Sequence, residues 1–359
     1  AQSLAEVQTI NELAALLDSL EPDAVDYDRL EQALVRYRQI RAQGGWPAVR
    51  LDFTLRPEMR DPAVEVLRAR LQRVGDLQET VVEDPQYYDA GLVAAVRRFQ
   101  RRHGLVADGL VGPQTRMALN VPVEQRIQQI IANLERWRWL PQGLGDRYLL
   151  VNTAGFDIKM VVDDRPVFQQ PTINGRLKRQ TPSFSSRITH LVINPTWTVP
   201  RTIAVEDLLP KQQADPEFLQ RRGIEVFQRE AGQWVQLDPL SLDWSQYHKD
   251  RFPFLLRQVP GVKNSLGQIK FQMANPYAIF LHDTPVKSLF NKPIRAFSSG
   301  CVRVRQADQL ARRLLDSAKG TLDSYLQSGE TQIEKLPLAM PVYLVYFTSW
   351  VDEDGTVQF

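Results

Sequence analysis

The sequence contains few of the residues that build metal sites, disulfides or cofactor loops. It has one cysteine and four histidines in 359 residues. A lone cysteine has no partner within the chain for a disulfide. The histidines do not stand at the spacings of zinc ligands, and no glycine-rich phosphate loop with its lysine is present. We therefore predict neither a metal site nor a bound cofactor.

Long apolar runs are missing as well. No segment approaches the ~18–20 apolar residues that a membrane helix needs. The basic and apolar regions of a secretion signal do not follow Ala1. If the protein is exported, we expect its signal or anchor to be absent from this chain.

Charge of one sign does not dominate. The chain has 44 basic and 42 acidic residues, a formal net charge of +2. This balance gives no signal for a polyanionic partner, so we predict no binding to nucleic acid. The arginine pairs Arg97–Arg98 and Arg101–Arg102 are interpreted as solvated helix faces.

The one cysteine has a polar, glycine-containing neighbourhood. Cys301 follows Ser298, Ser299 and Gly300, and His282 ends an apolar run upstream. A thiol with a histidine to accept its proton is the minimum set for thiolate catalysis. The alternative is that Cys301 is a small buried apolar residue. The flexible backbone at Gly300 and the positive charge of Arg303 favour the catalytic interpretation.

This segment resembles the signature of the L,D-transpeptidases of the YkuD family. That signature is a histidine, a gap, then Ser/Thr-His-Gly-Cys, an apolar residue and Arg or Asn. Ser298, Gly300, Cys301, Val302 and Arg303 fit it. Ser299 departs from it, because the family usually has a second histidine there. The resemblance implies Cys301 as the nucleophile and His282 as the base.

The resemblance also implies roles for neighbouring residues. Backbone N–H groups near Ser299, Gly300 and Cys301 would hold the oxyanion. A backbone carbonyl beside the histidine usually orients the imidazole in this family, and we favour it over the Asp283 side chain. Arg303 would bind a substrate carboxylate or form a structural salt bridge. The residues themselves, with Trp197 before a proline-bounded loop, favour packing of this side chain in a core, and stacking on substrate is the alternative.

The chain divides by pattern into four parts and an insertion. Residues 1–60 predict a helical scaffold, in which Leu30, Leu34, Tyr37 and Ile40 form one apolar stripe. Residues 61–121 predict three helices with Gly/Asp turns, and their spacing resembles a peptidoglycan-binding module. Residues 122–146 predict a linking helix, and 147–359 the catalytic domain. Within it, residues 201–265 lack clean periodicity and are interpreted, largely from the resemblance, as a lid, with a structural excursion as the alternative.

The catalytic part has short apolar runs and period-two patterns. These predict strands at 148–152, 157–162, 190–195, 277–281 and 342–348, with a hairpin turn at Asp163–Asp164. A helix is expected over 308–317. We therefore predict an α+β chain whose catalytic domain is mostly β, a YkuD-like β-sandwich.

The resemblance implies the function. We expect a peptidoglycan L,D-transpeptidase that forms 3→3 cross-links between meso-diaminopimelate residues, acting on tetrapeptide stems and inhibited by carbapenem β-lactams. An L,D-carboxypeptidase with the same site and an inactive wall-binding scaffold stay open. The expected location is the periplasm, with an inner-membrane anchor outside this chain. The sequence does not determine the oligomeric state.

Overall fold

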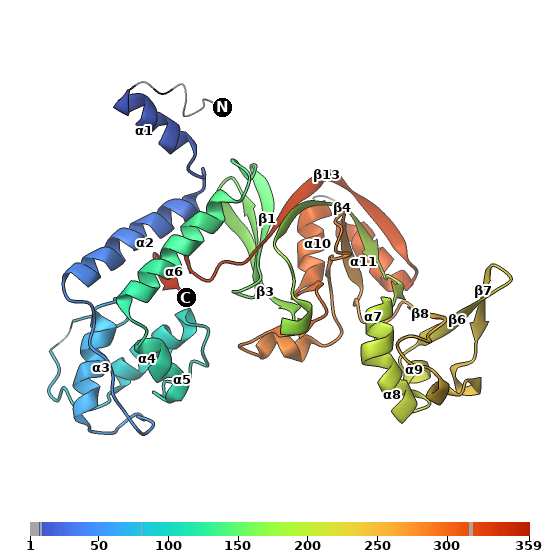
Figure 1. The fold of residues 1–359 in the computed structure, drawn as a ribbon, viewed down its shortest axis with the longest axis horizontal. Coiled ribbons are helices and arrows are strands. Elements are labelled where there is room, and N and C mark those ends of the chain that lie inside the picture. Colours follow the sequence, from blue (N-terminus) through green and yellow to red (C-terminus); the bar gives the residue numbers. More distant parts are fainter. Residues whose placement is uncertain (1–6, 8, 80, 316–318) are drawn as a thin grey trace. The chain divides into compact units, whose positions relative to one another are not determined.

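The computed structural model describes residues 7, 9–79, 81–315 and 319–359. The chain forms two compact units, one of Ala1–Gly145 with Tyr346–Phe359 and one of Asp146–Val345. No helix of the described residues is long and apolar enough to span a bilayer. Helices and strands are mixed, as predicted (Figure 1).

The first unit is helical. Its helices are α1 Ile10–Ser19, α2 Val25–Ala42, α3 Pro62–Gln72, α4 Ala90–Arg102, α5 Pro113–Leu119 and α6 Val123–Arg138. The predicted stripe of α2 is buried, and α2 lies beside α6 (Figure 1). The three predicted helices of the module are α3, α4 and α5, and they enclose a core that includes Leu92, Val96 and Phe99.

The last residues of the chain belong to this helical unit. Two short strands, β14 Trp350–Val351 and β15 Val357–Gln358, pair with each other. The Phe359 N–H donates to the Arg102 carbonyl at 2.9 Å, and Arg102 Nη1 donates to the Val357 carbonyl at 3.3 Å. The second unit therefore ends at Val345, whereas the predicted catalytic domain extends to residue 359. Helix α6, predicted as a linker, also lies within the first unit.

The second unit is built on one nine-stranded sheet in the order β11-β3-β12-β10-β9-β4-β13-β1-β2. Its strands are β1 Arg147–Asn152, β2 Asp157–Val162, β3 Arg165–Gly175, β4 Phe184–Ile193, β9 Ile269–Met273, β10 Leu281–His282, β11 Ala296–Ser298, β12 Val302–Val304 and β13 Gln332–Val345. Strand β3 pairs with β2 along its first part and with β12 at its end, so the sheet closes on itself. Helices α10 Ala307–Leu315 and α11 Lys319–Ser328 complete this domain.

The sequence predicted the hairpin correctly and one strand incorrectly. Asp163 and Asp164 have φ of 48° and 60°, the left-handed values of a tight hairpin turn between β2 and β3. The predicted strand over 277–281 is wrong except at Leu281. Asn275 instead bonds both the N–H and the carbonyl of Ile279, and Ala278 has a φ of 53°. This segment is therefore a loop.

The insertion after β4 has its own sheet and core. Its strands are β5 Trp197–Thr198, β6 Ile224–Glu230, β7 Gln233–Leu237 and β8 Phe254–Gln258, and its helices are α7 Arg201–Ile203, η3 Ala204–Leu208, α8 Leu209–Ala214 and α9 Phe218–Arg221. Its core includes Val226, Trp244 and Phe254. The insertion is thus a folded subdomain, with a core separate from that of the large sheet.

A buried ion pair should hold the helical unit together. Arg102 and Asp76 are 5% and 6% exposed, so the interpretation of Arg102 as part of a solvated helix face is wrong. Arg102 Nη2 donates to Asp76 Oδ2 at 2.6 Å. Asp76→Asn leaves the buried guanidinium without its counter-charge, so we expect a loss of about 3–5 kcal/mol in unfolding free energy. The exposed pair of Glu135 with Arg138 provides the control, and Glu135→Gln should cost below about 1 kcal/mol. Urea unfolding of both variants tests this, and equal losses would contradict it.

Candidate active site

Two short parallel strands bring the thiol and the imidazole to one face of the sheet. In the pairing of β10 with β12, Leu281 lies opposite Val302 and His282 opposite Arg303. Leu281 and Val302 are fully buried in the core. Because side chains alternate along a strand, His282, Arg303 and the preceding Cys301 share the other face. The structure thus brings together the predicted nucleophile and the predicted base.

The conformation of the loop before Cys301 requires glycine. Gly300 has a φ of +119°, which residues with a side chain rarely adopt. A Cβ there would meet only ordinary contacts, the nearest at 3.7 Å from Ile279. Glycine is therefore favoured at position 300 by the positive φ of the backbone, and not by a lack of space for a side chain.

His282 is held by a backbone carbonyl. Its ring is 4% exposed, and Nδ1 lies 2.5 Å from the Asp283 carbonyl oxygen. A carbonyl can only accept, so the neutral ring carries its proton on Nδ1, and Nε2 is the nitrogen with the lone pair. This agrees with the orienting role expected for a carbonyl beside the histidine.

The Asp283 side chain is engaged elsewhere. Its carboxylate pairs with Lys287 and accepts the Gln268 N–H at 3.1 Å. A Cβ on Gly267 would stand 2.3 Å from Asp283 Oδ2, so glycine is required for this close approach. The carboxylate therefore fixes the backbone whose carbonyl holds His282.

Cys301 and His282 are both neutral at pH 7. Burial first, and the charge of Arg303 second, lower the pKa of His282 to about 3. Burial raises the pKa of Cys301, against the opposing effects of the Phe280 amide, Lys270 and Arg303. In the part of the chain that the structure describes, no hydrogen bond joins the two side chains. Such catalytic contacts often tighten only when substrate binds.

Two cations flank the thiol without a carboxylate partner. Among the described residues neither Arg303 nor Lys270 forms an ion pair, and Arg303 Nε is buried without a hydrogen-bond partner. Lys270 lies opposite His282 on β9, with Nζ 4.2 Å from the centre of the Phe280 ring. Burial lowers the pKa of both groups, whereas the thiol raises it. The structural salt bridge considered for Arg303 is thus not found in the described ranges.

Sequence analysis missed Lys270. Its neighbours Ile269 and Phe271 face the core, so alternation places the lysine on the opposite face. Nothing in the sequence distinguished it from a solvent-exposed strand residue. Only its pairing with His282 identifies it as a site residue.

The other residues predicted for the site, Ser299, Gly300 and Trp197, contact other protein groups. Ser299 Oγ accepts from Arg179 Nη1 at 3.0 Å, and the Gly300 N–H donates to Ser298 Oγ at 3.1 Å. Trp197 is half-buried and packs against the core of the insertion, which favours the packing interpretation. Among the described residues, no three His, Cys, Asp or Glu side chains are grouped to hold a metal ion.

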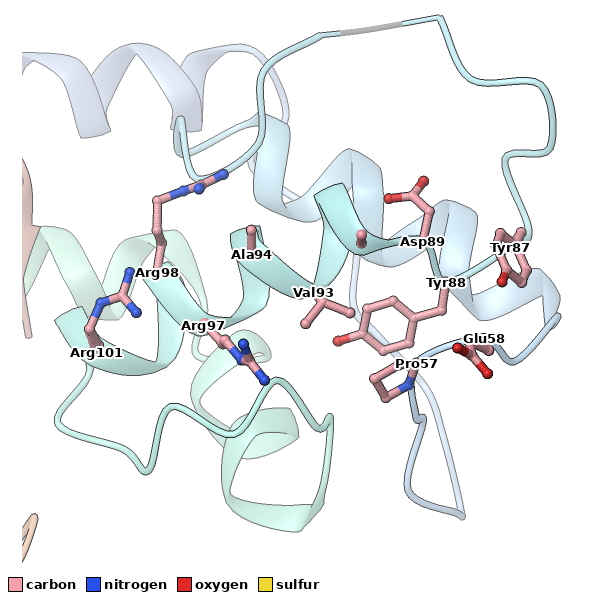
Figure 2. Close-up of a pocket in the computed structure, with 11 residues that line it drawn as sticks. Pro57, Glu58, Tyr87, Tyr88, Asp89, Val93, Ala94, Arg97, Arg98 and Arg101 are labelled. Carbon is pink, nitrogen blue, oxygen red and sulfur yellow. The ribbon is translucent and has the colours of Figure 1, made fainter.

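A second candidate site lies on the three-helix module. A cavity of about 600 Å³ opens between α4 and two loops, with Tyr88 beside Val93 and Pro57 and with three arginines of α4 along its wall (Figure 2). Arg98 is used structurally, since it donates to the Asp76 carbonyl at 2.7 Å. Arg97 and Arg101 form no ion pair within the described ranges. These two arginines therefore provide uncompensated positive charge at a cavity.

The buried His282 should make stability depend on pH. The unfolded imidazole binds a proton near pH 6.5 and the folded one only near pH 3, so acidification through this window favours unfolding. The wild-type unfolding free energy should fall by about 1.4 kcal/mol per pH unit relative to His282→Gln. Urea unfolding of both proteins from pH 7 to pH 4 tests this. Parallel curves would contradict it.

Two families of known proteins match this chain, one over the unit with the large sheet and one over the three-helix module. The L,D-transpeptidase catalytic domain of the YkuD family matches residues 146–333, and a family described as "Putative peptidoglycan binding domain" matches residues 60–119. A Haemophilus influenzae protein named "Putative L,D-transpeptidase" is 34% identical over 233 residues, which are 64% of this chain. The match spans 46% of the length of that relative.

Solved structures of L,D-transpeptidases are also similar, at low sequence identity. One from Stackebrandtia nassauensis is 13% identical, covers 83% of this chain and 96% of its own, and has a TM-score of 0.31. L,D-transpeptidase 3 of Mycobacterium tuberculosis, with a faropenem-derived adduct, is 10% identical, covers 56% of this chain and 60% of its own, and has a TM-score of 0.28. The family match over residues 146–333, more than half of the chain, shows that this protein belongs to the L,D-transpeptidases of the YkuD family.

Proposed function

We propose that this protein is a peptidoglycan L,D-transpeptidase that forms 3→3 cross-links through a Cys301 acyl-enzyme. The observation that carries the proposal is the shared face of Cys301 and His282, with the unprotonated Nε2 of His282 available as base. Peptidoglycan lies outside the inner membrane, so this function assigns the protein to the periplasm.

The first step acylates the thiol. His282 Nε2 takes the proton of Cys301 as Sγ attacks the carbonyl carbon on the L-centre of diaminopimelate. The Gly300 N–H is engaged with Ser298, so the Cys301 N–H is the donor that we assign to the oxyanion. The C–N bond to D-Ala then breaks, and His282 returns the proton to the leaving amine.

The second step transfers the acyl group. The side-chain amine of another diaminopimelate attacks the thioester, its proton passes to His282, and the thiolate leaves and is reprotonated. Arg303 and Lys270 lie beside the thiol without a carboxylate of their own. We assign to them the binding of a substrate carboxylate.

The cross-linking reaction is tested with a disaccharide-tetrapeptide and mass spectrometry. We expect a dimer that has lost one D-Ala, and Cys301→Ala should lower its formation by roughly 10³-fold or more, because the covalent nucleophile is lost. Dimer formation by the alanine variant would refute the assignment. A hydrolysed tripeptide without dimer would instead identify an L,D-carboxypeptidase.

A β-lactam should label the same thiol, because its strained amide resembles an acyl donor. Intact-protein mass spectrometry with imipenem should show one adduct, absent in Cys301→Ala. His282→Ala should slow labelling by roughly 10²-fold, as expected for loss of a general base. His248, an exposed residue of the insertion, provides the matched control, and His248→Ala should label at the wild-type rate.

The arginine-lined cavity is the surface that we propose for peptidoglycan binding by residues 60–119. Arg97→Gln with Arg101→Gln should weaken retention on isolated sacculi about tenfold by removing two anion-binding groups. Arg38→Gln with Arg41→Gln, on exposed positions of α2, makes the same change in charge outside the cavity and should have no effect. Equal retention of both double variants would refute the site. Point variants are preferred to deletion because Arg102 of α4 holds the C-terminal strands.

A further inference from the structure

A loop after β3 holds the segment that carries the thiol. The Arg176 N–H donates to the Ser298 carbonyl at 3.0 Å, and Thr181 Oγ1 donates to the Gly300 carbonyl at 2.8 Å. Between these two contacts, Arg179 Nη1 donates to Ser299 Oγ at 3.0 Å. Three successive residues before Cys301 are therefore fixed by one short loop.

The loop folds tightly back on the end of β3. The Gly175 N–H donates to Thr181 Oγ1 at 2.9 Å. A Cβ on Gly175 would stand 2.2 Å from the Arg179 carbonyl oxygen and 2.6 Å from the Thr181 nitrogen. Both atoms belong to the backbone and cannot move aside, so the position of Arg179 is set by the strand itself.

The same arginine also binds the insertion. Its Nη1 donates to Asp207 Oδ2 at 2.6 Å, and its Nη2 donates to Glu206 at 2.5 Å. Both acids lie on η3, a π-helical turn, and such turns are frequent at functional sites. Arg176 Nη2 also donates to both carboxylate oxygens of Asp207, at 2.8 and 2.9 Å.

The ion pairs of Asp207 and Arg179 affect the pKa of each group more than burial does. Burial raises the pKa of Asp207, but bonding to Arg176 and Arg179 lowers it below its ordinary value. Burial lowers the pKa of Arg179, but its two carboxylate partners raise it. The groups are therefore charged at neutral pH. Because the guanidinium is planar and rigid, a shift of Asp207 must change the contact with Ser299.

We propose that Arg179 is a positioning residue that couples the insertion to the nucleophile segment: Asp207 orients Arg179, and Arg179 orients Ser299 beside Cys301. The proposal rests on the proposed function, in which Cys301 is acylated. A substrate that displaces the insertion would alter the placement of the thiol through this one side chain.

Two reactions of Cys301 distinguish an effect on the orientation of the thiol from an effect on its ionisation. Cys301 is the only cysteine of the chain, so every thiol adduct reports on it. Acylation by imipenem requires an oriented nucleophile, whereas alkylation by iodoacetamide across pH 6–10 reports thiol ionisation. The cations that act on the ionisation of Cys301 are Lys270 and Arg303, not Arg179. Variants of Arg179 should therefore slow acylation without moving the alkylation midpoint.

The expected result is a non-additive loss of acylation. Arg179→Gln should slow acylation about tenfold and Asp207→Asn about threefold, and the double variant should equal Arg179→Gln alone. Ser299→Ala keeps the backbone N–H and should be non-additive with Arg179→Gln as well. Glu217→Gln, which removes an exposed pair of the insertion with Arg221, provides the control and should leave the rate unchanged.

Two outcomes would overturn the coupling. One is acylation of Asp207→Asn and Arg179→Gln at the wild-type rate. The other is a double variant whose loss of rate equals the product of the two single losses. A shifted alkylation midpoint or a lowered melting temperature would make Arg179 a structural residue instead. If wild-type protein gains no imipenem adduct at all, the proposed function fails rather than the coupling.

Discussion

The pairing of β10 with β12 is the constraint on which the active site depends. Each strand contributes very few residues, yet a register shift of one residue would turn His282 into the core and Leu281 into the site. The fully buried Leu281 and Val302 prevent that shift, because either would lose its apolar surroundings. The hydrophobic core therefore sets the relative positions of Cys301 and His282.

The electrostatics of the site follow from the same burial. A buried imidazole resists protonation, and partial burial of the thiol opposes its ionisation, so the pair rests without charge. In the proposed acylation, proton transfer from Cys301 to His282 would accompany formation of the Sγ–C bond. In that proposed reaction, the cations beside the thiol would favour the developing negative charge, because no carboxylate pairs with them among the described residues.

Sequence patterns predicted the parts of the fold that depend on local structure. The hairpin at Asp163–Asp164 and the helices around Leu92 and Phe99 follow from turn residues and apolar spacing. The strand over 277–281 was mispredicted because an apolar run cannot show that Asn275 will bond to Ile279 and bend the chain.

The site was predictable only where it follows a contiguous motif. Cys301 and His282 carry a recognisable spacing, and the role of the Asp283 carbonyl agrees with the expectation from family resemblance. Lys270 and Arg179 carry no such signal, because each reaches the site by pairing between segments distant in the sequence. The return of residues 346–359 to the helical unit is equally non-local.

That return makes the helical unit discontinuous along the chain. Its buried Arg102 bonds the Val357 carbonyl, and the ring of His103 stacks on Phe359 with centroids 5.6 Å apart. A chain still under synthesis has α1 to α6 long before these last residues exist. The helical unit, whose helices precede the large sheet in the sequence, is therefore completed after it, and loss of residues 357–359 would damage the helical unit before the large sheet.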